Sequence, residues 1–351
     1  MSRPDPDWEI RTLLLRNVIG ANFWSRRPVT RMDLTVGAYE EISSADVSGF
    51  RERLERAMPG LIEHRCSEGE RGGFLTRLDL GTYAPHIIEH VALELQNMIG
   101  HDVGYGKTRG AGAPGEYTLV FEYRHPAVAL RAATLALGIV RRAFAGTLDG
   151  LGDAVNELRA ISASPILEVA ERHASIAITG GSAREATRAE LERRGVCSEK
   201  VVEVAPALIL AEGLPLSRCD VAVITDAALT DVPERYREAG NARKLVSVLC
   251  DAASDGGIVV APMGEYYIHE YARKRECRLA IFWLGERGAQ RGNRALATAW
   301  VSGDRIRIQL ADGRRLTDEA VRDDAPLAAQ LAAALAAAVL GETVAHSRRS
   351  Q

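Results

Sequence analysis

The sequence predicts two domains: an α+β domain over residues 1–160 and an α/β domain with a mainly parallel sheet over residues 165–345. Three observations support this division. The chain has 351 residues, more than one ordinary hydrophobic core accommodates. Strand-like and helix-like patterns alternate unevenly in the first part, as in a sheet covered by helices. Continuous apolar runs separated by helical patterns in the second part are typical of buried parallel strands.

The composition is that of an ordinary globular protein, with 46% hydrophobic and 26% charged residues. A formal net charge of −3 creates no global field that would favour nucleic acid. No apolar run is long enough to span a bilayer, and the acidic start MSRPDPDWEI lacks the apolar core of a signal peptide. The five cysteines are scattered and form no C-x-x-C pair, which favours reduced thiols. We therefore expect a cytoplasmic protein that binds neither nucleic acid nor membranes.

The first domain is expected to mix short strands and helices. Residues 32–36 and 117–123 alternate apolar and polar side chains, as half-buried strands do. Residues 46–57 and 125–144 have the apolar spacing of helices. Residues 61–66 have a strand-like composition.

A histidine-bearing helix is predicted between Pro85 and Gly100, because no glycine or proline interrupts it. On such a helix His86 and His90 lie one turn apart, about 6 Å along the axis, which allows both to bind one ion. Glu89 lies about a quarter-turn aside, within reach of a metal-bound water. This is the H-x-x-E-H signature of inverted zinc peptidases. It predicts His86 and His90 as zinc ligands and Glu89 as a general base.

The same five residues also fit two ordinary histidines on an amphipathic helix. Metal binding is favoured because five of the eight histidines fall in one short region, namely His64, His86, His90, His101 and His125.

The third metal ligand is predicted to be Glu122, on a strand that is expected to run beside the helix. Glu116, His64 and Cys66 are the alternative candidates for this third ligand. Glu94 lies about 12 Å along the helix axis from His86, too far for the two residues to bind one ion. Glu94 therefore either orients the His90 ring or is a solvated helix residue.

Residues 104–115 contain five glycines and are predicted to form a mobile loop. The loop is either a simple connector or a lid at the rim of the metal site. We assign Lys107 and Arg109 catalytic roles there, steadying an oxyanion or the carboxylates of a substrate.

Several blocks of the first domain resemble, in order, the N-terminal domain of cyanophycin synthetases over roughly residues 10–145. They are Asn22–Ser25, Glu63–Cys66, Gly72–Phe74, His86–Gln96, Gly104–Arg109 and Val120–Tyr123. In that family the domain holds the growing polymer, an Asp backbone with Arg on its side chains, and in some members it resembles a metallopeptidase that cuts the polymer into primers. The resemblance implies zinc at His86 and His90 with Glu89 as base, and leaves the third ligand open.

The second domain begins with a strand, a glycine turn and a helix over residues 175–194, which resembles the P-loop of a Mur ligase. A working P-loop reads G-x-x-x-x-G-K-[ST], but here the glycines end at Gly181 and no Lys-Ser/Thr pair follows. We therefore predict a degenerate Mur-ligase-like domain that binds no ATP. Strands are expected near residues 201–204, 221–224, 257–261 and 279–282. Helices are expected near residues 184–194, 234–253 and 265–275. A hairpin at 299–310 and a helix at 326–340 are expected to follow.

These features predict a zinc-dependent peptidase that acts on cyanophycin or a related Asp/Arg polymer or peptide. The alternative is a non-catalytic polymer-binding or scaffold protein of the cyanophycin synthetase family, which would act beside a full-length synthetase. An ATP-dependent ligase is disfavoured by the missing P-loop lysine. The sequence leaves homo-oligomerisation open.

Overall fold

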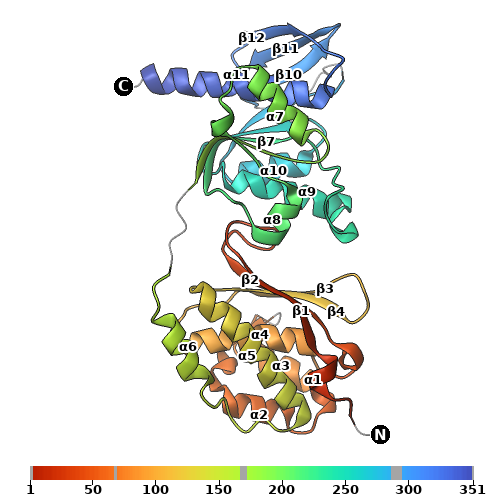
Figure 1. The fold of residues 1–351 in the computed structure, drawn as a ribbon, viewed down its shortest axis with the longest axis vertical. Coiled ribbons are helices and arrows are strands. Elements are labelled where there is room, and N and C mark those ends of the chain that lie inside the picture. Colours follow the sequence, from red (N-terminus) through yellow and green to blue (C-terminus); the bar gives the residue numbers. More distant parts are fainter. Residues whose placement is uncertain (1–2, 67–68, 167–171, 286–294, 350–351) are drawn as a thin grey trace. The chain divides into compact units, whose positions relative to one another are not determined.

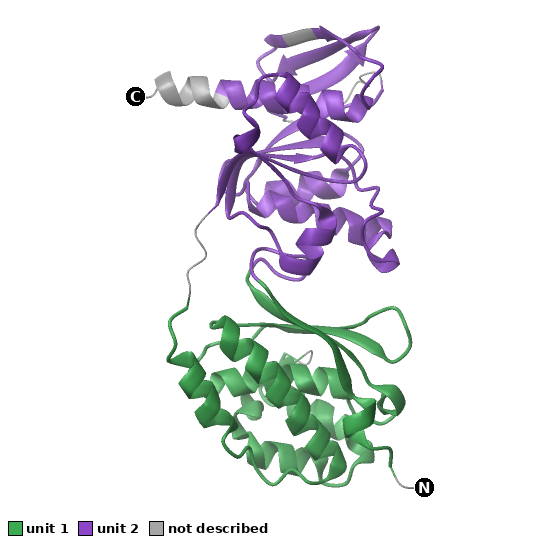
Figure 2. Cartoon of the chain, viewed as in Figure 1, with its two compact units in different colours: residues 1–18, 27–169 green, residues 19–26, 170–351 purple. Residues whose placement is uncertain are grey.

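The computed structural model describes residues 3–66, 69–166, 172–285 and 295–349, and the chain divides into two compact units (Figure 2). Unit 1 comprises residues 1–18 and 27–169, and unit 2 comprises residues 19–26 and 170–351. The division near residue 169 lies close to the predicted boundary. The short segment 19–26, which the sequence places in the first domain, belongs to unit 2.

Unit 1 contains a four-stranded antiparallel sheet in the order β1-β2-β4-β3. Figure 1 shows the helices of this unit gathered on one side of the sheet. The strands are β1 (Arg11–Val18), β2 (Val29–Thr35), β3 (Gly106–Gly110) and β4 (Glu116–Glu122). The helices are α1 (Pro6–Glu9), α2 (Phe50–Ala57), α3 (Gly73–Leu80), α4 (Ala84–Asn97), α5 (Pro126–Ala145) and α6 (Ala154–Ser162).

The alternation of apolar residues decides which face of this sheet is buried. Met32 and Leu34 of β2, with Leu119 and Phe121 of β4, are fully buried in one hydrophobic core with the apolar residues of the helices. In the cross-strand register Phe121 faces Gly106 and Leu119 faces Thr108. Alternate residues of β3 therefore lie over the helical layer.

Two local predictions for unit 1 are wrong. Residues 104–115 contain the strand β3, because pairing with β4 outweighs the low strand propensity of their glycines. Residues 61–66 do not form a strand, since Pro59–Glu63 is a 3-10 helix that begins at a proline.

Helix α4 lies at the centre of unit 1. Ile87, Ile88, Val91 and Leu95 are fully buried in the core, which accounts for one face of the helix. The helix contacts α5, β3 and β4. Its histidines occupy another face, so burial of the apolar face fixes where they point.

Unit 2 is built on an eight-stranded mixed sheet in the order β12-β11-β10-β9-β8-β7-β5-β6. The strands from β6 to β10 in that order run parallel, while β10, β11 and β12 are antiparallel. The strands are β5 (His173–Thr179), β6 (Val201–Glu203), β7 (Arg218–Ile224), β8 (Ile258–Pro262), β9 (Arg278–Phe282), β10 (Ala297–Ser302), β11 (Arg305–Leu310) and β12 (Arg315–Ala320). The hairpin predicted at 299–310 is the β10–β11 pair.

Helices cover both faces of this sheet, so its strands are apolar on both sides. Ile176 and Ile178 of β5 belong to one core, and Ala177 between them belongs to the other. The helices are α7 (Arg184–Arg193), α8 (Pro206–Glu212), α9 (Ala239–Ser247), α10 (Tyr266–Lys274) and α11 (Leu327–Arg349). None of the described helices is long and apolar enough to cross a membrane.

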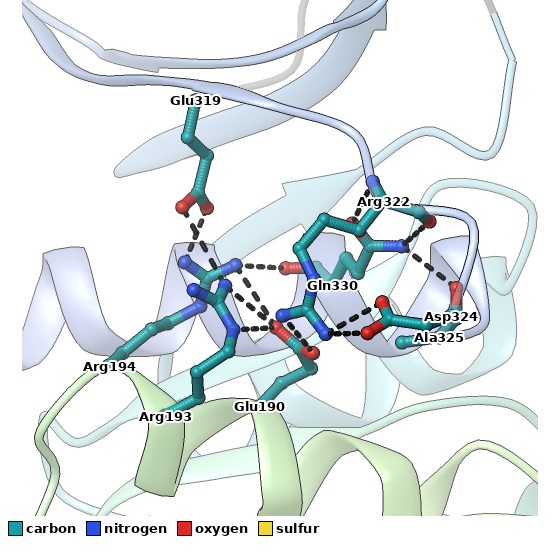
Figure 3. A network of polar contacts seen from close by, with 8 residues as sticks. All are labelled: Glu190, Arg193, Arg194, Glu319, Arg322, Asp324, Ala325 and Gln330. Carbon is teal, nitrogen blue, oxygen red and sulfur yellow. Dashed lines mark hydrogen bonds and ion pairs between the residues drawn. The ribbon is translucent and has the colours of Figure 1, made fainter.

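A charged network joins α7 to the C-terminal part of unit 2 (Figure 3). Glu190, only 4% exposed in its side chain, accepts hydrogen bonds from Arg193 at 2.9 Å and Arg322 at 2.9 Å. Arg194 lies 3.6 Å from the same carboxylate and also pairs with Glu319 of β12. These contacts attach β12 and the segment before α11 to the helical layer.

Candidate metal centre

Three potential metal-binding side chains converge in unit 1. One ligand atom each from Cys66, His86 and His90 lies within 4.8 Å of the other two. The Nε2 atoms of His86 and His90 are 3.2 Å apart, and Cys66 Sγ is 3.3 Å from His86 Nε2. The spacing of the two histidines on α4 is the one that the sequence predicts. The third residue, Cys66, comes from the segment before α3 and was only an alternative candidate in the sequence-based prediction.

Each histidine is held through its other ring nitrogen. Thr82 Oγ1 lies 2.9 Å from His86 Nδ1, and His64 Nδ1 lies 2.9 Å from His90 Nδ1. His64 Nε2 is in turn 3.0 Å from Glu94 Oε2. One set of tautomers satisfies all these contacts: His86 and His90 donate from Nδ1, and His64 donates from Nε2 to Glu94. In that set the Nε2 lone pairs of His86 and His90 face each other, as two ligands of one cation do.

Burial keeps these imidazoles neutral. Burial, with a smaller effect from Arg77, lowers the pKa of His86 to about 4. Burial also lowers the pKa of His90 well below its ordinary value, and His86 and His64 add to that effect. The Phe74 ring stacks on His90 with centroids 4.0 Å apart and fixes the plane of the imidazole. Neutral, oriented imidazoles are the form that binds metal ions.

Glu89 lies beside the cluster on α4, and its side chain is buried. Burial raises its pKa to about 7, although the hydroxyl of Thr108, which donates to the carboxylate, opposes the rise. A Cβ atom at Gly106 would lie 2.4 Å from Glu89 Oε1, so a larger residue there would force the Glu89 carboxylate to move. Gly60 likewise leaves room for Glu94, because a Cβ atom at position 60 would lie 1.9 Å from Glu94 Oε1.

A cavity of about 830 Å³ extends from the cluster. Its wall contains the three convergent side chains and Glu89, together with β3 residues Gly106 to Arg109. Four basic side chains line it, namely Arg65, Arg77, Lys107 and Arg109. Lys107 and Arg109, predicted from the sequence to lie near the site, therefore line the same cavity as the histidines, but from a strand instead of a loop. The cavity wall has more basic than acidic groups, which favours an anionic ligand.

The structure places Glu122, the predicted third ligand, away from this cluster. Its carboxylate accepts a hydrogen bond from Arg27 at 2.8 Å and lies 3.8 Å from Arg124. Glu116 lies at the start of β4 and is also outside the cluster. The alternation along β4 predicted its strand correctly, but sequence alone could not show which residues lie opposite α4.

The backbone at Cys66 adopts a conformation that is uncommon for a residue with a side chain. Its φ angle of 52° lies in the left-handed region, where glycine or asparagine is more usual. Strained residues of this kind cluster at functional sites. Thr82 and Phe74 were not singled out from the sequence. Thr82 precedes the first residue of α4, so no helical periodicity signals its contact with His86.

The glycine turn after β5 in unit 2 is occupied by a side chain of the protein itself. Asp226 Oδ1 accepts hydrogen bonds from the backbone N–H of Gly181 at 3.1 Å and of Ala228 at 2.8 Å. The backbone amide of Gly181 therefore already binds a carboxylate.

Comparisons with known proteins concern mainly unit 1. Residues 31–145 match the family described as cyanophycin synthase-like N-terminal domain. Over 116 residues the chain is 47% identical to a cyanophycin synthetase of Synechocystis sp., a match that covers 32% of this chain and 13% of that protein. It is 37% identical over 163 residues to the cyanophycin synthetase of Geminocystis herdmanii, a match that covers 45% of this chain and 19% of that protein. The chain thus spans less than a fifth of the length of these curated relatives.

One solved structure with a detectable likeness is the UDP-N-acetylmuramoylalanyl-D-glutamyl-2,6-diaminopimelate--D-alanyl-D-alanyl ligase from Acinetobacter baumannii. It is 14% identical, with a TM-score of 0.30, and the match covers 60% of this chain and 47% of that one. The finer prediction of a degenerate Mur-ligase-like domain at 165–345 stays a prediction.

The comparisons contradict the predicted function of a zinc-dependent hydrolase. The relatives of unit 1 are named synthetases, and a synthetase joins its substrates where a peptidase cleaves them. The H-x-x-E-H spacing describes the geometry of α4 correctly, but five residues cannot identify a reaction.

Proposed function

We propose that unit 1 binds an extended polymer or peptide rich in carboxylates, of the cyanophycin type, at a divalent metal ion held by Cys66, His86 and His90. The observation that carries this proposal is the position of the three convergent ligand atoms in the wall of a basic cavity. The match to a cyanophycin synthase-like N-terminal domain supports the class of polymer.

The donor set fits a divalent transition metal. One thiolate and two imidazoles are softer ligands than carboxylates, so they favour such ions over magnesium or calcium. Three protein ligands leave at least one coordination position for a ligand oxygen. The contacts of Thr82 and His64 hold the imidazoles with their Nε2 atoms toward this position.

The basic residues of the cavity suit a chain with regularly spaced carboxylates. Lys107 and Arg109 lie two residues apart on β3, which places both side chains on the same side of the strand. Arg65 and Arg77 line the same cavity from the segment before α3 and from α3 itself. A polymer with an Asp backbone and Arg on its side chains offers one carboxylate per unit to these groups.

The metal is tested first, by measuring cobalt binding to the full chain by absorption spectroscopy and by elemental analysis. We expect one ion per chain, with a thiolate-to-metal absorption band. Cys66→Ala should lose that band, and His86→Ala and His90→Ala should lose the ion. His173→Ala, which changes an exposed histidine of unit 2, is the matched control and should bind as the wild type does.

Polymer binding is tested by calorimetry with a short synthetic peptide that has an Asp backbone and Arg on its side-chain carboxyl groups. We expect binding that weakens with added salt, and a further loss of about tenfold in the Lys107→Ala, Arg109→Ala double variant. The peptide should be recovered intact. A double variant that binds the peptide as tightly as the wild type would show that the basic residues of the cavity do not bind it.

A further inference from the structure

Strand β3 is an edge strand of the unit 1 sheet, and it contributes to the cavity that contains Cys66, His86 and His90. In the order β1-β2-β4-β3 it pairs with β4 on one side, and no strand among the described residues pairs with its other side. An unpaired strand edge presents a row of backbone donors and acceptors to any extended chain that comes alongside.

The hydrogen-bond pattern shows which residues of β3 present these groups. Glu122 N donates to Tyr105 O, and Ala111 N donates to Glu116 O. Residues of an antiparallel ladder alternate in direction, so Lys107 and Arg109 also turn their backbone groups toward β4. The amides and carbonyls of Gly106 and Thr108 therefore point away from β4, to the outer edge.

The side chains of β3 connect this edge to the cavity. Thr108 donates its hydroxyl to Glu89, next to His90 in the sequence, and Gly106 allows the strand to lie against the same carboxylate. All four residues from Gly106 to Arg109 line the cavity that contains the metal cluster. A chain laid along this edge would thus pass beside the cluster.

We propose that the carboxylate-bearing chain docks as an additional strand on β3, exchanging backbone hydrogen bonds with Gly106 and Thr108. This inference rests on the proposed function and specifies how its ligand is bound. The mode is strand addition, in which main-chain bonds give affinity and side-chain contacts give specificity. A strand of five residues spans roughly 17 Å, so it accommodates about five backbone units of the polymer.

The two cations of β3 argue for a carboxylate-bearing chain as the occupant. Lys107 and Arg109 flank Thr108 in the sequence and line the cavity, so carboxylates on alternate residues of a docked strand meet two cations at the spacing of the strand. A peptide without carboxylates would gain the backbone bonds without these contacts. Backbone pairing alone is tolerant of sequence, so the charges supply the selectivity.

Hydrogen exchange measured residue by residue on the full chain provides the first test. When the synthetic Asp/Arg peptide is added, the amides of Gly106 and Thr108 should exchange at least tenfold more slowly. The Lys107 amide, already bonded to β4, serves as the internal control and should change little.

A proline substitution provides the second test. Thr108→Pro removes the outward amide without breaking a bond to β4, as proline does on edge strands. The matched control is Thr108→Ala, which loses the hydroxyl contact to Glu89 but keeps the amide. We expect Thr108→Pro to bind the peptide about tenfold more weakly than Thr108→Ala.

N-methylated peptides provide the third test and need no variant protein. A peptide N-methylated at every backbone amide has no donor to offer β3 in any register, so it should lose affinity about tenfold relative to a peptide N-methylated only at alternate amides, which can still present its free set to the strand.

The outcomes separate this inference from the proposed function. If the wild type binds no peptide, both are overturned. If it binds the peptide but Gly106 and Thr108 gain no protection, and the fully methylated peptide binds as tightly as the alternately methylated one, strand addition alone is overturned and the cavity remains the binding site.

Discussion

The Nδ1 atoms of His64 and His90 lie 2.9 Å apart, and the other nitrogen of His64 lies 3.0 Å from Glu94 Oε2. Glu94 therefore reaches His90 through a second imidazole. The sequence suggested that Glu94 orients His90, but it could not show the intermediate histidine, which is 26 positions away from His90 along the chain.

His64→Ala should weaken metal binding about 10- to 100-fold without abolishing it, because His64 orients a ligand and does not itself bind the ion. The measurement is competition of the bound ion against a chelator. His101→Ala is the control, since His101 contacts Ser162 outside the cluster. A variant that lost the ion as completely as His90→Ala would make His64 a ligand.

The thiols should differ sharply in reactivity. Cys197 is exposed, whereas Cys219, Cys250 and Cys277 are buried and burial raises their pKa values. Because the thiolate is the reactive form, we expect iodoacetamide to label Cys197 first and the three buried thiols only on unfolding. Peptide mapping by mass spectrometry checks this order. Cys66 should be labelled more slowly once cobalt is added, and equal rates with and without cobalt would argue against its coordination.

Glu190→Gln should destabilise unit 2 by about 3 kcal/mol, because it removes the buried charge on which Arg193, Arg194 and Arg322 converge. Thermal or urea unfolding measures the loss. Glu192→Gln on the same helix is the control, since Glu192 is well exposed and pairs only with Arg188 in the described structure; it should change stability by about 0.5 kcal/mol or less. Equal effects of the two substitutions would contradict the buried network.

His269 should make unit 2 less stable in mild acid. Burial lowers its pKa in the folded state, where its Nε2 lies 3.0 Å from the carbonyl of Pro262. Below the ordinary histidine pKa of about 6.5 the unfolded chain binds a proton that the folded chain resists, so stability falls as the pH decreases through that value. His269→Gln removes this contribution. Urea unfolding at pH 7.5 and pH 5.5 measures how much stability is lost between the two pH values, and this loss should be smaller in the variant than in the wild type. Equal losses in the two proteins would exclude His269 as the cause.

Periodicity predicted the elements that depend on local patterns. The alternation in residues 117–123 and the uninterrupted run after Pro85 correspond to β4 and α4. The glycine-rich segment around Lys107 was predicted as a loop because glycine disfavours strands in isolation. Its strand exists because β4 supplies the partner groups, and a partner in the fold cannot be read from local composition.

The sequence by itself determined that two histidines stand one turn apart on a helix with an acid beside them, because the helical repeat alone sets that spacing. It also determined the parallel strands of unit 2, since burial on both faces demands continuous apolar runs. Only the tertiary structure decided that Cys66, and not Glu122, completes the cluster, and that β3 lies at an edge of the sheet where Lys107 and Arg109 line the cavity. Both features depend on how segments distant in the sequence pack together. The packing free energy arises from contacts across the whole unit, so no local stretch of sequence determines it.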